Sequence, residues 1–236
     1  METISTSVSF RQISVILRGE TQPIHDSLQQ WNAGRTLLYI LVIVAGTGLY
    51  GAAMGSWRDP QQALYTAFKF PLIILLTTFG NGLLNGMLAP LLGLDASFRQ
   101  SLQAMLMSFM IVGAILGSFS PVVFFMVWNA PPMTAKASGI YDFILLMDVV
   151  VVALAGMAAN LRLAQLLRRL SSSAAVSRRV LFAWLTGNLI LGSQLSWILR
   201  PFIGAPGMPV EFLRKNALDG NFFEAVFHSL KQLLGS

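Results

Sequence analysis

Five long apolar stretches divide this chain, and polar or helix-breaking segments separate them. The stretches cover approximately residues 36–56, 70–94, 102–128, 141–159 and 180–199. A helix of about 20 apolar residues is long enough to cross the hydrocarbon core of a bilayer. The pattern predicts an all-α integral membrane protein with a bundle of five transmembrane helices.

The segments on both sides of this transmembrane domain (residues 36–200) carry short amphipathic patterns. In residues 1–35, "FRQISVILRG" places Phe10, Ile13 and Leu17 at helical spacing between two arginines. This pattern is typical of a short amphipathic interfacial helix, and a loosely ordered tail fits it equally well.

The C-terminal tail, residues 201–236, contains a helix start signal. Glu224 follows Asn221 by three residues, which is the spacing of a capping box. Apolar residues then recur on one face of the helix, namely Phe223, Val226, Phe227, Leu230, Leu233 and Leu234. The segment is too short to cross a bilayer, so we expect it to lie on the membrane surface or on the bundle.

The last apolar stretch ends abruptly in "SQLSWILRPFIGAPG". Trp197 is a residue type that prefers the membrane interface, and Arg200 can reach lipid headgroups. Pro201 cannot continue a helix comfortably. These three residues predict an anchor at the non-cytoplasmic surface of the membrane.

Composition supports a membrane location, since 55% of the residues are hydrophobic and only 11% are charged. Soluble domains carry roughly 25% charged residues. The first 30 residues contain no apolar core followed by a small-residue cleavage site, so we expect no removable signal peptide.

The net charge of +6 reflects basic residues that lie beside the apolar stretches, where they set orientation rather than bind nucleic acid. Five arginines crowd the loop between the fourth and fifth stretches: Arg162, Arg168, Arg169, Arg178 and Arg179. Arg11, Arg18, Arg35 and Arg99 fall on the same side. The distribution predicts a cytoplasmic N-terminus and a C-terminus outside.

Catalytic and metal-binding chemistry finds little support in the sequence. The chain has no cysteine, and its two histidines, His25 and His228, lie outside the apolar stretches and on opposite sides of the predicted topology. Common metalloprotease, nucleophile-elbow and phosphate-loop motifs are missing. We therefore expect neither an enzyme nor a cofactor or metal site.

Small residues recur four positions apart within four of the stretches: Gly51 with Gly55, Gly82 with Gly86, Gly113 with Gly117, and Ala155 with Ala159. This spacing lets helix backbones approach closely. Close packing inside one bundle is the favoured interpretation, and an interface in a homo-oligomer is the alternative.

Several side chains inside the apolar stretches are polar and need partners there. Asn81 and Asn85 share a helix face in the second stretch, and Asn188 and Gln194 lie in the fifth. They predict hydrogen bonds between helices, or else a hydrated pathway or a head-group pocket.

Asp148, in "LLMDVVVVAL", is the most informative single residue. A carboxylate at the centre of a span costs roughly 2.5–3.5 kcal/mol on insertion scales, so it should face the protein interior. Lys69 and Asp142 lie near the same outer face, and Lys69 can pair with either acid. Three interpretations stay open: a structural ion pair, a protonated and hydrogen-bonded acid, and an ion or proton site.

The segments "GAAMGSW", "AFKFPLIILLTT" and "SQLSWILRPFIGAPG" resemble uncharacterised bacterial polytopic membrane proteins loosely grouped with the Yip-type family. The likeness covers most of residues 45–207. It implies a bacterial inner-membrane location and no particular activity. The five-span plan with a cytoplasmic N-terminus is also similar to Yip-type trafficking proteins, which bind small GTPases and other membrane components.

Together these features predict a non-enzymatic membrane scaffold or accessory subunit that recruits other membrane proteins through its arginine-rich loop and outer tail. The alternative is a small-solute or ion transporter or channel subunit that uses Asp148, Asn81, Asn85 and Asn188. An intramembrane enzyme is a third interpretation.

Overall fold

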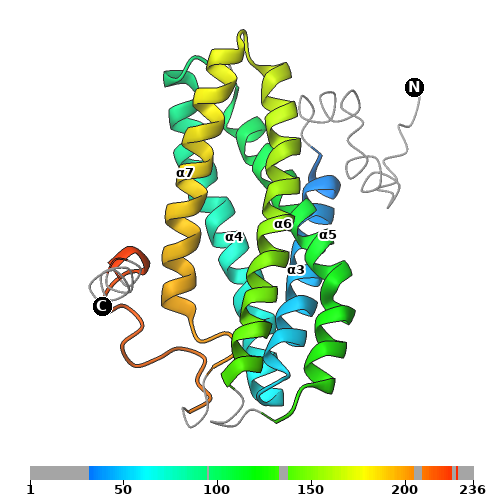
Figure 1. Ribbon diagram of the computed structural model, residues 1–236. Helices are drawn as coiled ribbons and strands as arrows, with labels where there is room; N and C mark the ends of the chain where they lie inside the picture. The colour runs from blue at the N-terminus through cyan, green and yellow to red at the C-terminus, as the bar shows by residue number, and fades with distance from the viewer. Residues whose placement is uncertain (1–31, 95, 133–137, 205–208, 225–226, 228–236) are drawn as a thin grey trace, which may run out of the picture.

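The computed structural model describes residues 32–94, 96–132, 138–204, 209–224 and 227. Five long helices run alternately up and down in this part of the chain (Figure 1). They are α3 (Ala33–Gly55), α4 (Pro60–Leu91), α5 (Phe98–Asn129), α6 (Ser138–Leu170) and α7 (Ala174–Leu199). The all-α prediction is confirmed, and the described residues form no strand. The predicted N-terminal amphipathic segment lies outside these residues.

Four of the helices have the length and apolar composition of a membrane crossing: α3, α4, α5 and the part of α6 from Phe143 onward. The chain is therefore a multi-pass membrane protein. The 26-residue α7 falls outside this group, because Asn188, Gln194 and several serines lower its apolar content.

Local capping determines where the helices begin. The Asp59 side chain accepts a hydrogen bond from the Gln61 amide, and Pro60 occupies the first turn of α4. Consequently α4 starts well before the predicted residue 70. The Ser173 hydroxyl accepts from the Val176 amide and starts α7, and this leaves only residues 171–173 between α6 and α7. The apolar pattern marks the hydrocarbon core, whereas the helices continue beyond it.

Glycines bring α3 against both α4 and α5. A methyl group added at Gly46 would overlap the backbone of Gly113, and one added at Gly117 would lie 2.8 Å from the Cα of Gly46. Gly51 and Gly55 face the backbone of α4 near Thr66 and near Gln62 in the same way. Close packing within one bundle is confirmed for these glycines.

We predict that Gly46→Ala destabilises the bundle by about 1–3 kcal/mol, because α3 and α5 must separate to accept the methyl group. Gly156→Ala on α6 is the matched control, since an added methyl there meets nothing within 4 Å. Thermal unfolding in detergent should show a lower midpoint for Gly46→Ala only. Equal midpoints for the two variants would contradict this account of the α3–α5 contact.

Candidate functional site

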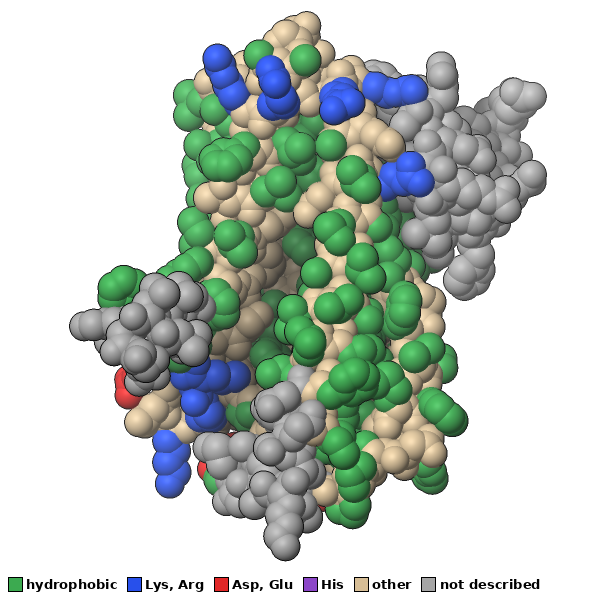
Figure 2. All heavy atoms as spheres, viewed as in Figure 1, with side chains coloured by type: hydrophobic (Ala, Val, Ile, Leu, Met, Phe, Trp, Pro, Cys, Tyr) green, Lys and Arg blue, Asp and Glu red, His purple; other side chains and the backbone are tan. Residues whose placement is uncertain are grey.

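A cavity of about 810 Å³ lies between α6 and α7, and the surface is visibly hollowed there (Figure 2). Its walls are mostly apolar and include Leu145, Val149 and Val152 of α6 and Leu189 of α7. The residues that follow α7, from Arg200 to Gly204, form part of the same wall. The cavity therefore has apolar sides and a polar end near the exit of α7.

Asp148 lies on the wall of this cavity and is only 3% exposed. The Tyr50 hydroxyl of α3 donates a 2.8 Å hydrogen bond to its Oδ1 atom. Its Oδ2 atom has no hydrogen-bond partner among the described residues. The structure thus places the acid inside the bundle beside the cavity, with one oxygen bonded to Tyr50 and the other buried without a partner among the described residues.

Lys69 of α4 is fully buried, and its hydrogen-bond partner is a backbone carbonyl rather than an acid. Its Nζ donates a 2.8 Å hydrogen bond to the Pro201 carbonyl and lies 5.3 Å from the centre of the Phe212 ring. The side chain of Asp142 lies outside the described part of the chain. Lys69 therefore binds the segment that follows α7, and it does not pair with Asp148.

Two further α4 side chains hold the same exit segment. The Gln62 amide donates to the carbonyls of Pro201 at 3.1 Å and Phe202 at 2.7 Å, and the Thr66 hydroxyl donates to Phe202 at 2.8 Å. Gln62, Thr66 and Lys69 lie on one helix face, because side chains three or four positions apart are neighbours. Sequence analysis missed Gln62 and Thr66 because it placed them before the second span. The Asp59–Pro60 start signal would have revealed them.

The predicted anchor residues meet at the end of α7. The Arg200 guanidinium lies over the Trp197 ring, 2.8 Å from its centre, and the indole nitrogen donates to the Asp219 carbonyl at 3.2 Å. Pro201 follows a cis peptide bond and presents its carbonyl to α4. The anchor is thus tied both to the bundle and to the tail.

One of the two hydrogen bonds of the predicted capping box is present, since the Asn221 side chain accepts a 2.8 Å hydrogen bond from the Glu224 amide. The Phe222 amide donates to Gln194 of α7 at 3.4 Å. This contact joins the tail to the bundle. The predicted apolar stripe beyond Phe227 lies outside the described residues.

The intramembrane amides form a separate cluster between α4 and α7. The Asn81 amide donates to the Asn188 side chain and, at 3.1 Å, to the Trp184 carbonyl. Asn85 is fully buried, and neither of its side-chain polar atoms has a hydrogen-bond partner among the described residues. None of these amides lines the α6–α7 cavity. The structure therefore separates the amides from Asp148.

The two asparagines of α4 should respond oppositely to replacement. Asn81→Leu removes two interhelical hydrogen bonds and is expected to destabilise the bundle by about 1–2 kcal/mol. Asn85→Leu removes a buried amide without partners and should leave stability unchanged or raise it. Thermal unfolding of the two variants in the same detergent provides the measurement. A loss of stability in Asn85→Leu equal to that in Asn81→Leu would show that both amides have partners.

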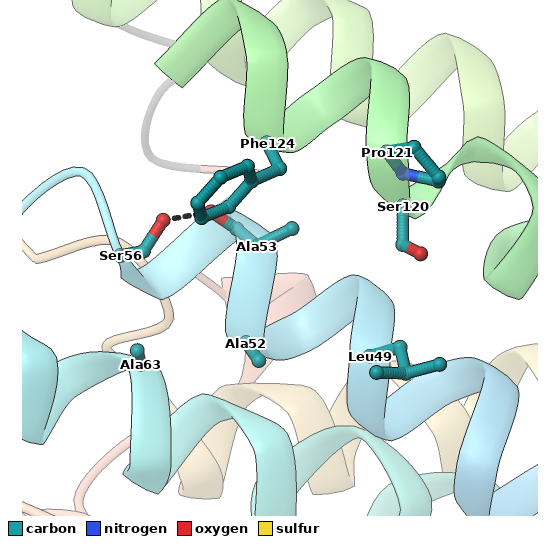
Figure 3. A pocket seen from close by; sticks show the side chains of 8 residues that line it. All are labelled: Leu49, Ala52, Ala53, Ser56, Ala63, Ser120, Pro121 and Phe124. Atoms are coloured by element: carbon teal, nitrogen blue, oxygen red, sulfur yellow. Dashed lines mark hydrogen bonds between the residues drawn. The ribbon is translucent and has the colours of Figure 1, made fainter. Parts of the chain in front are cut away.

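A second cavity, of about 430 Å³, lies beside α3 and α5 (Figure 3). Its polar side chains bond to their own helices: Ser56 donates to the Ala53 carbonyl and Ser120 to the Gly117 carbonyl, each at 2.7 Å. Pro121 lacks the amide that would otherwise bond to Gly117, so Ser120 satisfies that carbonyl. This cavity therefore offers a ligand little beyond apolar contact.

The basic end of the molecule lies opposite the exit of α7 (Figure 2). Four arginines there are exposed: Arg168, Arg169, Arg178 and Arg179. Arg162 is half-buried and donates a 3.1 Å hydrogen bond to Gln165. The predicted cluster is thus gathered around the α6–α7 connection.

No family model, characterised protein or solved structure matches this chain. The resemblance to the Yip-type grouping stays a prediction. Among the described residues, no three His, Asp or Glu side chains are grouped to hold a metal ion. The cavity that contains Asp148 is the site on which a functional argument rests.

Proposed function

We propose that this chain is a non-enzymatic, five-span protein that binds a lipid-soluble solute in the α6–α7 cavity, as a small transport protein or a transport subunit. The observation that carries the proposal is Asp148 on the wall of a large cavity, a buried acid with one oxygen that has no partner within the described part of the chain. Buried acids inside membrane helices are expensive, and transport and ion-binding sites commonly use them.

The apolar lining supports an occupant with a substantial apolar part. Small-molecule sites typically combine apolar walls with a few polar groups that fix orientation. Asp148 on one wall and Arg200 at the exit of α7 are such groups. A hydrated ion would find few partners along Leu145, Val149 and Val152.

The proposed topology adds α7 as the fifth crossing. At 1.5 Å per residue, its 26 residues extend about 39 Å, which exceeds the hydrocarbon thickness of about 30 Å. The arginines of the α6–α7 connection favour a cytoplasmic location for that end. In a bacterial inner membrane, the N-terminus is then cytoplasmic, and the cavity lies in the outer half of the bilayer.

Retention of a bound amphiphile tests the proposal. After purification in mild detergent, native mass spectrometry should detect one amphiphile per chain. Val152→Trp, which fills the cavity, should abolish the binding of this amphiphile. Val150→Trp is the matched control, because Val150 is an exposed α6 residue outside the cavity lining. Equal retention by both variants, or none by the wild type, would overturn the proposal.

Recruitment of partner proteins remains a second candidate function, and the four exposed arginines around the α6–α7 connection favour it. Such a cluster suits an acidic segment of a partner membrane protein. Crosslinking in native membranes should then capture a partner whose yield falls when Arg168, Arg169, Arg178 and Arg179 are changed to Gln. An unchanged yield would count against this role.

A further inference from the structure

The polar end of the α6–α7 cavity contains two arginines for which the described residues supply no carboxylate partner. Arg200 and Arg214 both line the cavity. The Nε atoms of both residues and one Nη atom of Arg214 are buried without hydrogen-bond partners among the described residues. Burial, together with the positive charge of Arg214, holds the pKa of Arg200 below its usual value. Arginine side chains in proteins are in general positively charged at physiological pH.

Two guanidiniums that line one cavity repel each other, as the effect of Arg214 on Arg200 indicates, and a bound anion offsets that repulsion. Two acids also line the cavity, Glu211 in the tail and Asp148 on α6, and the Oδ1 atom of Asp148 already accepts from Tyr50. Lys69 adds a third positive charge behind Pro201. The charge balance favours an anion over a neutral or cationic group.

The positions of these groups relative to the apolar walls define the shape of the occupant. The arginines follow the end of α7, at the membrane surface in the proposed topology, while Val149, Val152 and Leu189 line the part toward the bundle centre. An occupant therefore needs an anionic group at the surface and an apolar chain directed inward. Outer-leaflet phospholipids have this arrangement.

Building on the proposed function, we propose that the α6–α7 cavity binds an anionic phospholipid, with its phosphate on Arg200 and Arg214 and an acyl chain between α6 and α7. Arginine suits this role because its planar fork donates two hydrogen bonds to one phosphate. The headgroup must be net anionic, since a zwitterionic headgroup would add a cation beside two guanidiniums. The two arginines thus select the headgroup, and the apolar walls bind the acyl chain.

The test reconstitutes the full chain in nanodiscs that contain equal amounts of phosphatidylglycerol and phosphatidylcholine. After release into detergent, native mass spectrometry measures the ratio of the two lipids that remain bound. We expect about a tenfold preference for phosphatidylglycerol, which corresponds to about 1.4 kcal/mol. Arg214→Gln should reduce this preference to near unity. Lys215→Gln, which removes the neighbouring exposed charge, should preserve it.

Further arms distinguish the competing explanations. Inorganic phosphate or glycerol phosphate at millimolar concentration should not displace the lipid, and displacement by either would indicate a site for a free phosphate compound. Equal retention of both lipids, or equal effects of Arg214→Gln and Lys215→Gln, would overturn this inference while leaving the proposed function intact. The absence of any retained lipid would overturn both.

Discussion

Replacing Lys69 with glutamate is expected to cost about 3–5 kcal/mol of folding stability, the range seen when a buried charge loses its partner. The wild-type ammonium group donates to the Pro201 carbonyl from a fully buried position. A carboxylate there would face carbonyl oxygens that already accept from Gln62 and Thr66. The exit segment after α7 should detach, and with it one wall of the cavity.

Thermal unfolding and limited proteolysis check this expectation. Lys69→Glu should lower the unfolding midpoint and expose the chain after Leu199 to protease. Lys215→Glu is the matched control, because Lys215 is exposed in the same tail, and it should change the unfolding free energy by less than about 0.5 kcal/mol. If both variants unfold at the wild-type temperature, Lys69 does not hold the exit segment.

Replacing Asp148 with leucine is expected to raise stability by as much as about 2.5–3.5 kcal/mol, the cost of placing an aspartate within a span. The wild-type chain tolerates the acid because the Tyr50 hydroxyl bonds to one of its oxygens. Tyr50→Phe should act in the opposite direction, since it removes the one hydrogen bond that the described residues donate to the acid. In the Asp148→Leu background, Tyr50→Phe should have little effect.

A double-mutant cycle measured by thermal unfolding gives the coupling between the two residues. Asp148→Leu should also stop labelling by a hydrophobic carbodiimide, a reagent that attacks protonated carboxyl groups in apolar surroundings. Asp59, which caps α4, is the control acid on the same molecule. Lower stability in Asp148→Leu, or labelling of Asp59 alone in the wild type, would contradict the picture of a buried acid that faces the cavity.

The helices were largely predictable from sequence because the hydrocarbon core imposes an apolar length on each span. The residues at which the helices begin and end were less predictable. The start of α4 depends on the Asp59 cap and Pro60, and polar residues after Ala159 remain helical as far as Leu170. An apolar pattern does not reveal how far a helix continues beyond the hydrocarbon region.

The candidate site was predictable only in part. The cost of burying Asp148 in a membrane predicted that it faces inward, and it does. Its partner was not predictable, because Tyr50 lies 98 residues earlier in the chain. The hydrogen bond from Gln62 to Pro201 joins residues 139 positions apart. The cavity depends on how α6 and α7 are placed relative to each other. Sequence spacing along one helix contains none of this information.

Photolabelling tests most directly whether a lipid chain occupies the α6–α7 cavity. A phosphatidylglycerol with a diazirine at mid-chain is incorporated in nanodiscs, irradiated, and mapped by peptide mass spectrometry. Met54 is 5% exposed and lines the cavity from α3, behind α6 and α7. We predict label on the Met54 peptide in the wild type and in Val150→Trp, and none in Val152→Trp. Label confined to exposed residues such as Leu146 and Val150 would contradict the account.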